Sequence, residues 1–69
     1  MNLLGPRIKA LREEQRLTQG ELVTRGHLIG WDISRGTLAK IEAQVRRITD
    51  DEVPLIAQAL KVDIEELYS

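Results

Sequence analysis

Signals for the start of a helix recur at short intervals along this chain. Pro6 suits a first helical turn, because its φ is preset and it has no N–H to leave unpaired. Thr18 and Glu21 form a capping box, in which the hydroxyl accepts from the amide of Glu21 and the carboxylate bonds back to the cap. Ser34 predicts a third start. Two further starts are expected within residues 49–52 and 63–66. The chain is therefore expected to be all-α, with five short helices.

Apolar residues follow each start at helical spacing, which predicts the buried faces and the extent of each helix. The first helix is expected to end near Arg16, and the third to span about residues 34–46. The residues expected on the buried faces are Leu4, Ile8, Leu11, Leu22, Val23, Leu38, Ile41, Val45, Val53, Ile56, Ala57, Leu60 and Leu67. No alternation typical of strands interrupts this pattern.

The second and fourth helices have less sharply marked boundaries. The second can be fitted by a helix broken at Gly26 or by one that runs to Gly30. We favour the longer helix, with Gly30 as a left-handed stop. The fourth is expected to begin near Asp51, because an earlier start would place Pro54 beyond the first turn and remove a hydrogen bond.

The composition limits what can hold this fold together. The chain has 69 residues, and residues 1–69 should form a single domain. This is near the lower size at which an apolar core alone can stabilise a fold. There is no cysteine and no Phe, so the core must be aliphatic, with Trp31 and Tyr68 as the aromatic residues. No apolar run approaches the roughly 20 residues of a membrane span, and the first residues do not resemble a secretion signal. A cytoplasmic protein without a membrane role is expected.

The net charge of −1 conceals an uneven distribution. Residues 1–47 carry nine basic and five acidic side chains, which gives +4, whereas residues 48–69 carry one lysine and six acids, which gives −5. Such an arrangement presents one face to a polyanion and turns another away from it. Ordinary surface solubility explains the same pattern equally well.

One pattern of residues runs through nearly the whole chain. Its members are Arg12, Leu17-Thr18-Gln19, Glu21-Leu22, Ser34, Thr37-Leu38, Ile41-Glu42, Ile56-Ala57, Ala59-Leu60, Val62 and Leu67. On this pattern the chain resembles the lambda-repressor-like, or Cro-type, helix-turn-helix family of the xenobiotic-response-element type. Residues 30–34 and 37–42 are also similar to a phage-associated branch with an extended turn. The resemblance implies a five-helix transcriptional regulator, a repressor that binds operator DNA as a homodimer.

The chain departs from the family pattern in the length of its turn. The segment between Gln19 and Ser34 is five residues longer than is usual, which we interpret as one additional helical turn and two more loop residues. Arg16 and Gln44 also stand where the family often has glycine. The longer segment bears on how the second and third helices dock.

The resemblance implies that the third helix enters the major groove of double-stranded DNA. Arg35, Gly36 and Lys40 then occupy its base-reading positions, and Thr37 lies beside them. Arginine can pair with guanine through two hydrogen bonds, lysine reaches guanine acceptors, threonine offers a hydroxyl and a methyl, and glycine permits close approach. The alternative is a solvated helix face.

Other polar residues are assigned to the phosphate backbone or to structure. The resemblance places Gln19 on a phosphate, with Ser34 in the same group. Arg46 and Arg47 either meet phosphates or are solvated loop charges.

The resemblance also implies that Arg12 and Glu42 form an ion pair that braces the first helix against the third. Trp31 is expected to be a partly buried plug over the extended turn, in preference to a phosphate contact. His27 has no cysteine partners, so no metal site is expected.

Enzyme activity is not expected, since the sequence has no glycine-rich phosphate loop, no thiol and no partner for its lone histidine. No cofactor or small-molecule ligand is indicated. The competing interpretation is a protein-interaction module of the same fold, such as an antitoxin. The acidic segment of residues 48–69, which holds the fourth and fifth helices, is the expected dimer surface, with Ile48, Leu67 and Tyr68 as its contacts.

Overall fold

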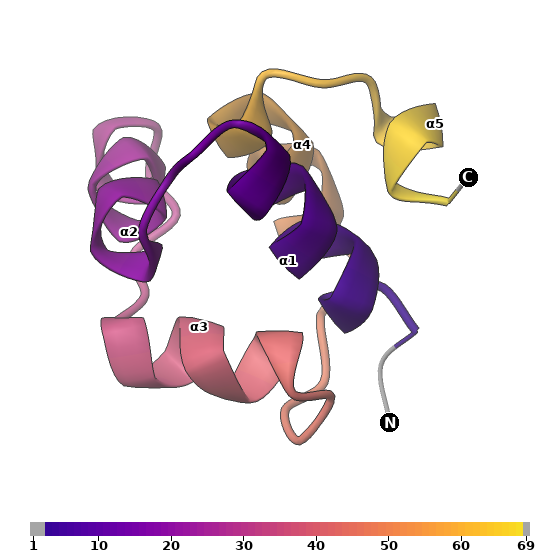
Figure 1. Ribbon diagram of the computed structural model, residues 1–69, viewed down its shortest axis with the longest axis horizontal. Helices are drawn as coiled ribbons and strands as arrows, with labels where there is room; N and C mark the ends of the chain where they lie inside the picture. The colour runs from indigo at the N-terminus through magenta and orange to yellow at the C-terminus, as the bar shows by residue number, and fades with distance from the viewer. Residues whose placement is uncertain (1–2, 69) are drawn as a thin grey trace.

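The computed structural model describes residues 3–68 and has five helices among them, each beginning near a predicted start (Figure 1). They are α1 (Gly5–Glu14), α2 (Gln19–Leu28), α3 (Arg35–Glu42), α4 (Glu52–Leu60) and α5 (Ile64–Leu67). None of the described residues lies in a strand, so the all-α prediction is confirmed. No helix within this part of the chain is long and apolar enough to cross a membrane.

Side-chain caps form at the starts of α2 and α3, as the sequence predicts. At α2, Thr18 Oγ1 accepts from the Glu21 amide at 3.1 Å, and Glu21 Oε1 accepts from the Thr18 amide at 2.8 Å. At α3, Ser34 Oγ accepts from the Thr37 amide at 3.1 Å. The start expected within residues 63–66 is confirmed, since α5 begins at Ile64, although the Asp63 side chain makes no capping bond.

Each of the helices α1 to α4 is followed within two residues by a residue with positive φ, and each end has the paired backbone bonds of a Schellman motif. The four residues are Arg16, Gly30, Gln44 and Lys61, with φ of 59°, 89°, 66° and 58°. Arg16 and Gln44 are the positions at which the family pattern has glycine, and the conformation explains that preference. Gly30 is the left-handed stop that the sequence predicts.

The end of α3 corrects one prediction. The helix stops at Glu42, because Gln44 turns the chain into the left-handed region, and the Gln44 and Val45 amides bond back to Ile41 and Lys40. Val45 therefore leaves the buried face on which it was expected and is 76% exposed.

Gly26 does not break α2, so the longer helix is the better description. A Cβ on Gly26 would lie 3.0 Å from Cε3 and from the carbonyl oxygen of Trp31. Glycine stands at this helical position because the extended turn folds back against it. Six residues, 29–34, connect α2 to α3.

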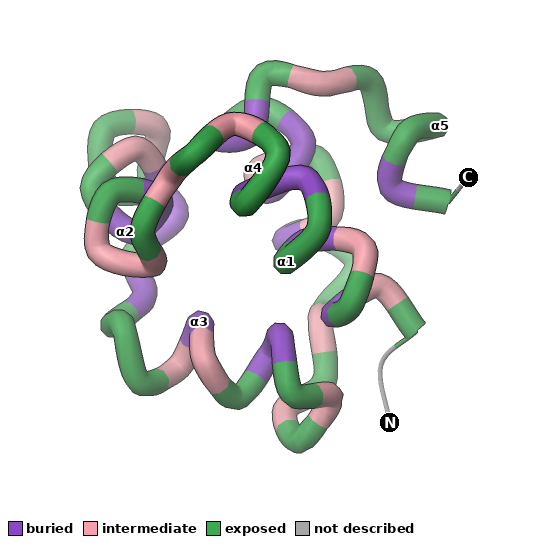
Figure 2. The backbone as a smooth tube through the Cα atoms, viewed as in Figure 1, coloured by how far each residue is buried: buried purple, intermediate pink, exposed green. Residues whose placement is uncertain are grey.

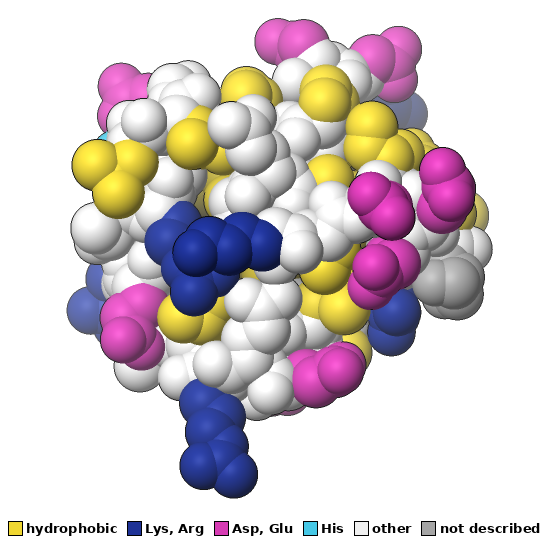
Figure 3. Space-filling model, turned by 90° about the horizontal axis from the view of Figure 1, so that it is seen from above, with side chains coloured by type: hydrophobic (Ala, Val, Ile, Leu, Met, Phe, Trp, Pro, Cys, Tyr) yellow, Lys and Arg dark blue, Asp and Glu magenta, His cyan; other side chains and the backbone are white. Residues whose placement is uncertain are grey.

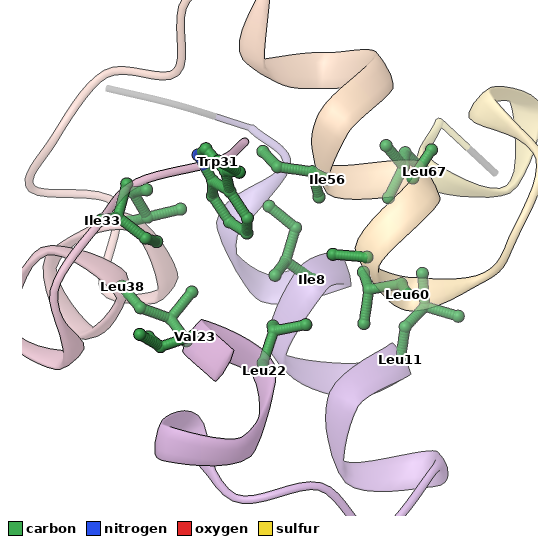
Figure 4. Close-up of a cluster of buried hydrophobic side chains, with 13 residues drawn as sticks. Ile8, Leu11, Leu22, Val23, Trp31, Ile33, Leu38, Ile56, Leu60 and Leu67 are labelled. Carbon is green, nitrogen blue, oxygen red and sulfur yellow. The ribbon is translucent and has the colours of Figure 1, made fainter. Parts of the chain in front are cut away.

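All five helices and the extended turn contribute to one core (Figure 4). Its buried members are Ile8, Leu11, Leu22, Val23, Trp31, Ile33, Leu38, Ile41, Ile56, Ala57, Ala59, Leu60 and Leu67. Leu67 is 1% exposed, so it packs inward as the periodicity predicts and cannot belong to a dimer surface.

Helix α3 forms one end of the molecule. It packs against α1 and α2, while α4 contacts α2 and α5. Figure 1 shows α2 at a steep angle to α3. One long side of α3 is therefore left without a neighbouring helix.

Candidate nucleic-acid interface

The side of α3 that faces away from the core carries Arg35, Gly36 and Lys40, all exposed. We call these three residues the outward face of α3. Leu38 and Ile41 lie on the opposite side and are completely buried. Figure 2 shows this division along the helix, with its buried positions turned toward α1. The helix thus presents small and cationic groups to solvent, with the geometry that the sequence predicts.

Ser34 and Thr37 close the N-terminal end of α3. The Ser34 hydroxyl donates to Thr37 Oγ1 at 3.0 Å, in addition to accepting from the Thr37 amide. Ser34 is exposed and Thr37 half-buried. In this structure the Thr37 hydroxyl therefore belongs to the helix cap, beside the outward face.

Arg35 brings the outward face of α3 next to the start of α2. A Cβ on Gly20 would lie 3.5 Å from Cδ of Arg35, so the arginine stem lies along the first turn of α2. The amides of a first helical turn lack partners within their helix and favour anions. Arg35 therefore adds a cation beside the first turn of α2, which also holds the carboxylate of Glu21.

Arg12, Gln19 and Glu42 form one network beneath this surface. Arg12 donates from Nε to Glu42 Oε2 at 2.7 Å and from NH2 to Oε1 at 3.1 Å, and from NH1 to the Leu17 carbonyl at 2.7 Å. Gln19 Nε2 donates to the same Glu42 Oε1 at 3.1 Å. The hydrogen bonds to Glu42 raise the pKa of Arg12, against a smaller opposing effect of burial. The network joins α1, the start of α2 and the end of α3.

The part that Gln19 plays in this network was not anticipated from the sequence. The first residue of α2 holds the last residue of α3, and so fixes the two helices relative to each other. An amide group has a second N–H and a carbonyl oxygen, which leaves it further hydrogen-bonding capacity.

Arg46 and Arg47, which were assigned together, occupy different surroundings. Arg46 NH1 donates to Glu52 Oε1 at 2.8 Å and to the Arg47 carbonyl at 2.8 Å. Arg47 is exposed in the loop that follows α3. The exposed cations on and just after α3 are therefore Arg35, Lys40 and Arg47.

Glu52 is the principal residue of this region whose role the sequence does not indicate. The residue is 8% exposed, and its carboxylate accepts from the Trp31 indole N–H at 3.0 Å, from Arg46, and from the Thr49 amide at 3.0 Å. Burial alone would raise the pKa of Glu52, but the hydrogen bonds from Arg46, Thr49 and Trp31 outweigh it and lower the pKa to about 2. An acid at a helix start is common, so nothing in the sequence distinguishes this one.

Trp31 is more deeply buried than the partly covered plug that was expected. It is 2% exposed, and its N–H is bonded to Glu52. His27 lies at the surface, where Nε2 is 2.7 Å from the Ile33 carbonyl and 3.4 Å from Asp32 Oδ1. Among the described residues, no group of three or more His, Asp or Glu side chains could hold a metal ion.

The acidic side chains of the C-terminal segment lie away from α3. Figure 3 looks onto the end of the molecule opposite α3 and shows acidic groups collected on the side where α5 lies. Asp63, Glu65 and Glu66 are exposed in this part of the chain. The structure thus separates the acidic C-terminal segment from the cationic outward face of α3.

Comparison with known proteins identifies one family. A family model described as helix-turn-helix matches residues 8–67. Searches of the curated proteins and of the solved structures found no match. The matched residues include all of α2, α3 and α4 and the connections between them.

Proposed function

We propose, from the premise that this chain belongs to the lambda-repressor-like helix-turn-helix family, that it regulates transcription by reading the major groove of double-stranded DNA with α3. The family is a DNA-binding one. The observation that carries the proposal is the outward face of α3, which has two exposed cations around a glycine on a helix without an outer neighbour. A helix of this kind fits the major groove, where a small residue permits close approach to base edges.

In this proposal the outward face provides base contacts. Arg35 and Lys40 donate to guanine acceptors, and Gly36 lets the backbone approach. Thr37 is half-buried and bonded to Ser34, so it contributes its methyl group and the remaining capacity of its hydroxyl.

The phosphate contacts come from residues around α3. Gln19 and the first turn of α2 face one phosphate, and Ser34 stands beside them at the start of α3. Arg47, which is exposed, takes a phosphate at the other end of the helix. Arg46 already donates to Glu52, so its phosphate contact in this proposal is limited to the rest of its guanidinium group.

One α3 touches too few base pairs for strong selectivity, so the proposal includes a homodimer on a near-palindromic operator. Half-sites about 10 base pairs apart would bring two copies of α3 onto one face of the duplex. Binding of this kind at a promoter represses transcription by excluding the polymerase.

The test uses selection of bound sequences from random duplexes, followed by affinity measurements on the preferred and random duplexes at several salt concentrations. Lys40→Ala should weaken binding to the preferred duplex by roughly 1–3 kcal/mol and relax one base pair per half-site. Arg47→Ala should weaken both duplexes by similar factors and flatten the salt dependence by about one unit per contact.

Lys61→Gly is the matched control. It removes a cation from the connection between α4 and α5, opposite α3, at a left-handed position that glycine adopts freely (Figure 1). It should leave sequence preference unchanged. If Lys40→Ala selects the same sequences with the same affinity as the parent, α3 is not the reading element. If the parent itself shows no salt-dependent DNA binding, the chain is a protein-interaction module of this family.

A further inference from the structure

Both segments that flank α3 are tied to one carboxylate, that of Glu52. Trp31 lies four residues before the first residue of α3, and Arg46 lies four residues after its last. The Trp31 indole N–H donates to Oε2 at 3.0 Å, and Arg46 NH1 donates to Oε1 at 2.8 Å. One side chain at the start of α4 therefore holds the chain on both sides of the recognition helix.

The contacts at this carboxylate are strong because the acceptor is ionised and its side chain is largely buried. Besides Trp31 and Arg46, the Thr49 amide and hydroxyl donate to Oε1 at 3.0 and 3.1 Å. Hydrogen bonds to an ionised acceptor in a protected site are about twice as strong as neutral ones, and they orient the groups that make them.

The connection before α3 is where such a restraint has most effect. It spans residues 29–34, and the Trp31 ring packs against Gly26 of α2 while its N–H reaches Glu52 of α4. Two residues, 32 and 33, then remain between Trp31 and the cap of α3. The bond to Glu52 thus removes most of the freedom that the longer connection would introduce.

We propose that Glu52 is the positioning residue of the DNA-reading helix: by holding Trp31 and Arg46 together, it sets the orientation in which α3 presents its outward face. This inference rests on the proposed function, since it assigns to Glu52 a role in sequence preference beyond the stability of the fold. Glu52 itself is buried, so in this proposal it acts through α3 and not by direct contact with a base.

Glu52→Gln tests the proposal, with Asp51→Asn as its matched control. Both changes remove one negative charge from the start of α4, but Asp51 is exposed and its side chain makes no capping bond. The two variants therefore have the same long-range effect on a polyanion. Glu52→Gln is isosteric and puts an N–H₂ group where the carboxylate accepts from Trp31 or Arg46.

The expected result is a loss of preference rather than of all binding. For Glu52→Gln, the ratio of affinities for the preferred and random duplexes should fall by about tenfold, because a loosely supported site loses its specific contacts first. Affinity for random duplex should match that of Asp51→Asn. In NMR spectra of the free proteins, the amide signals of Arg35 and Lys40 should move in Glu52→Gln and stay in place in Asp51→Asn.

Trp31→Phe keeps the test decisive if Glu52→Gln does not fold, because it removes one donor and leaves Arg46 and Thr49 on the carboxylate. Its preference ratio should fall by about fivefold, the equivalent of one buried hydrogen bond.

The inference is overturned if Glu52→Gln, or Trp31→Phe in its place, keeps the preference ratio of the parent, even where stability falls. If the parent has no preferred duplex, the DNA-reading proposal fails by itself. The comparison of the α3 amide signals then still decides whether Glu52 orients the helix.

Discussion

Replacing Arg12 by alanine would remove the donor on which the buried side of α3 depends. The guanidinium makes three hydrogen bonds, two to Glu42 and one to the Leu17 carbonyl. The Glu42 carboxylate accepts two hydrogen bonds from Arg12 and one from Gln19. After Arg12→Ala, only the bond from Gln19 is left of these three. We expect the free energy of unfolding to fall.

The magnitude follows from the burial of the pair. Removing one partner of a buried ion pair costs about 3–5 kcal/mol, because the other charge is left without compensation. The Gln19 bond and the entry of water into the vacated space reduce this cost, so we expect a loss of about 3 kcal/mol. A domain of 69 residues has a total stability of about 3–10 kcal/mol, so the variant should be only marginally folded at 25 °C.

Urea unfolding followed by circular dichroism measures the loss, in a double-mutant cycle with Glu42→Gln. The double variant should be more stable than the sum of the single effects predicts, with a coupling energy of about 2 kcal/mol. Lys9→Ala is the control, since it removes an exposed cation from the same helix and should change stability by less than about 0.5 kcal/mol. Additive single effects, or a loss below about 1 kcal/mol for Arg12→Ala, would refute the argument.

Three further predictions test other parts of the fold by the same unfolding assay. Gly26→Ala should lower the free energy of unfolding by about 1–2 kcal/mol, since the added Cβ would lie 3.0 Å from Trp31. Gly20→Ala, whose added Cβ has its nearest contact at 3.5 Å, should be neutral or raise it by up to about 1 kcal/mol. Equal effects of the two changes would contradict the packing argument. Arg16→Gly should gain about 0.5–1 kcal/mol, because φ is 59° there, and a loss would contradict it. The folded-state pKa of Glu52 is about 2, below its ordinary value of 4.5, so its contribution, at most about 3 kcal/mol, is fully present above pH 4.5 and is lost as the pH falls toward 2. The stability difference between the parent and Glu52→Gln should shrink over that pH range, and a difference that stays constant would argue against the lowered pKa.

Local chemistry explains which features of the fold could be predicted from the sequence. Thr18 and Glu21 cap α2 because two residues three apart meet wherever a helix begins, and Ser34 caps α3 for the same reason. The sequence predicts an end of α3 that is too late, because Val45 continues the apolar spacing. Gln44 adopts a left-handed conformation, which its residue type does not indicate.

The contacts beneath the candidate interface depend on distant parts of the chain. Gln19 and Glu42 are 23 residues apart, and Trp31 and Glu52 are 21 apart, so no local pattern relates either pair. Glu52 near the start of a helix has a sufficient local explanation as a residue that favours the helix dipole. Only the folded chain shows that its carboxylate also joins the two segments around α3.

The burial of Trp31 gives the protein an optical probe of its own. It is the only tryptophan, and its indole lies between Gly26 and Glu52 at the joint between α2 and α3. Its emission should shift to longer wavelength when water reaches the ring, before or together with global unfolding. Tyr68, the only tyrosine, is exposed in the last turn of the chain and reports on the opposite side of the molecule. Local opening beside α3 can therefore be followed in the unmodified protein, without a dye or an added label.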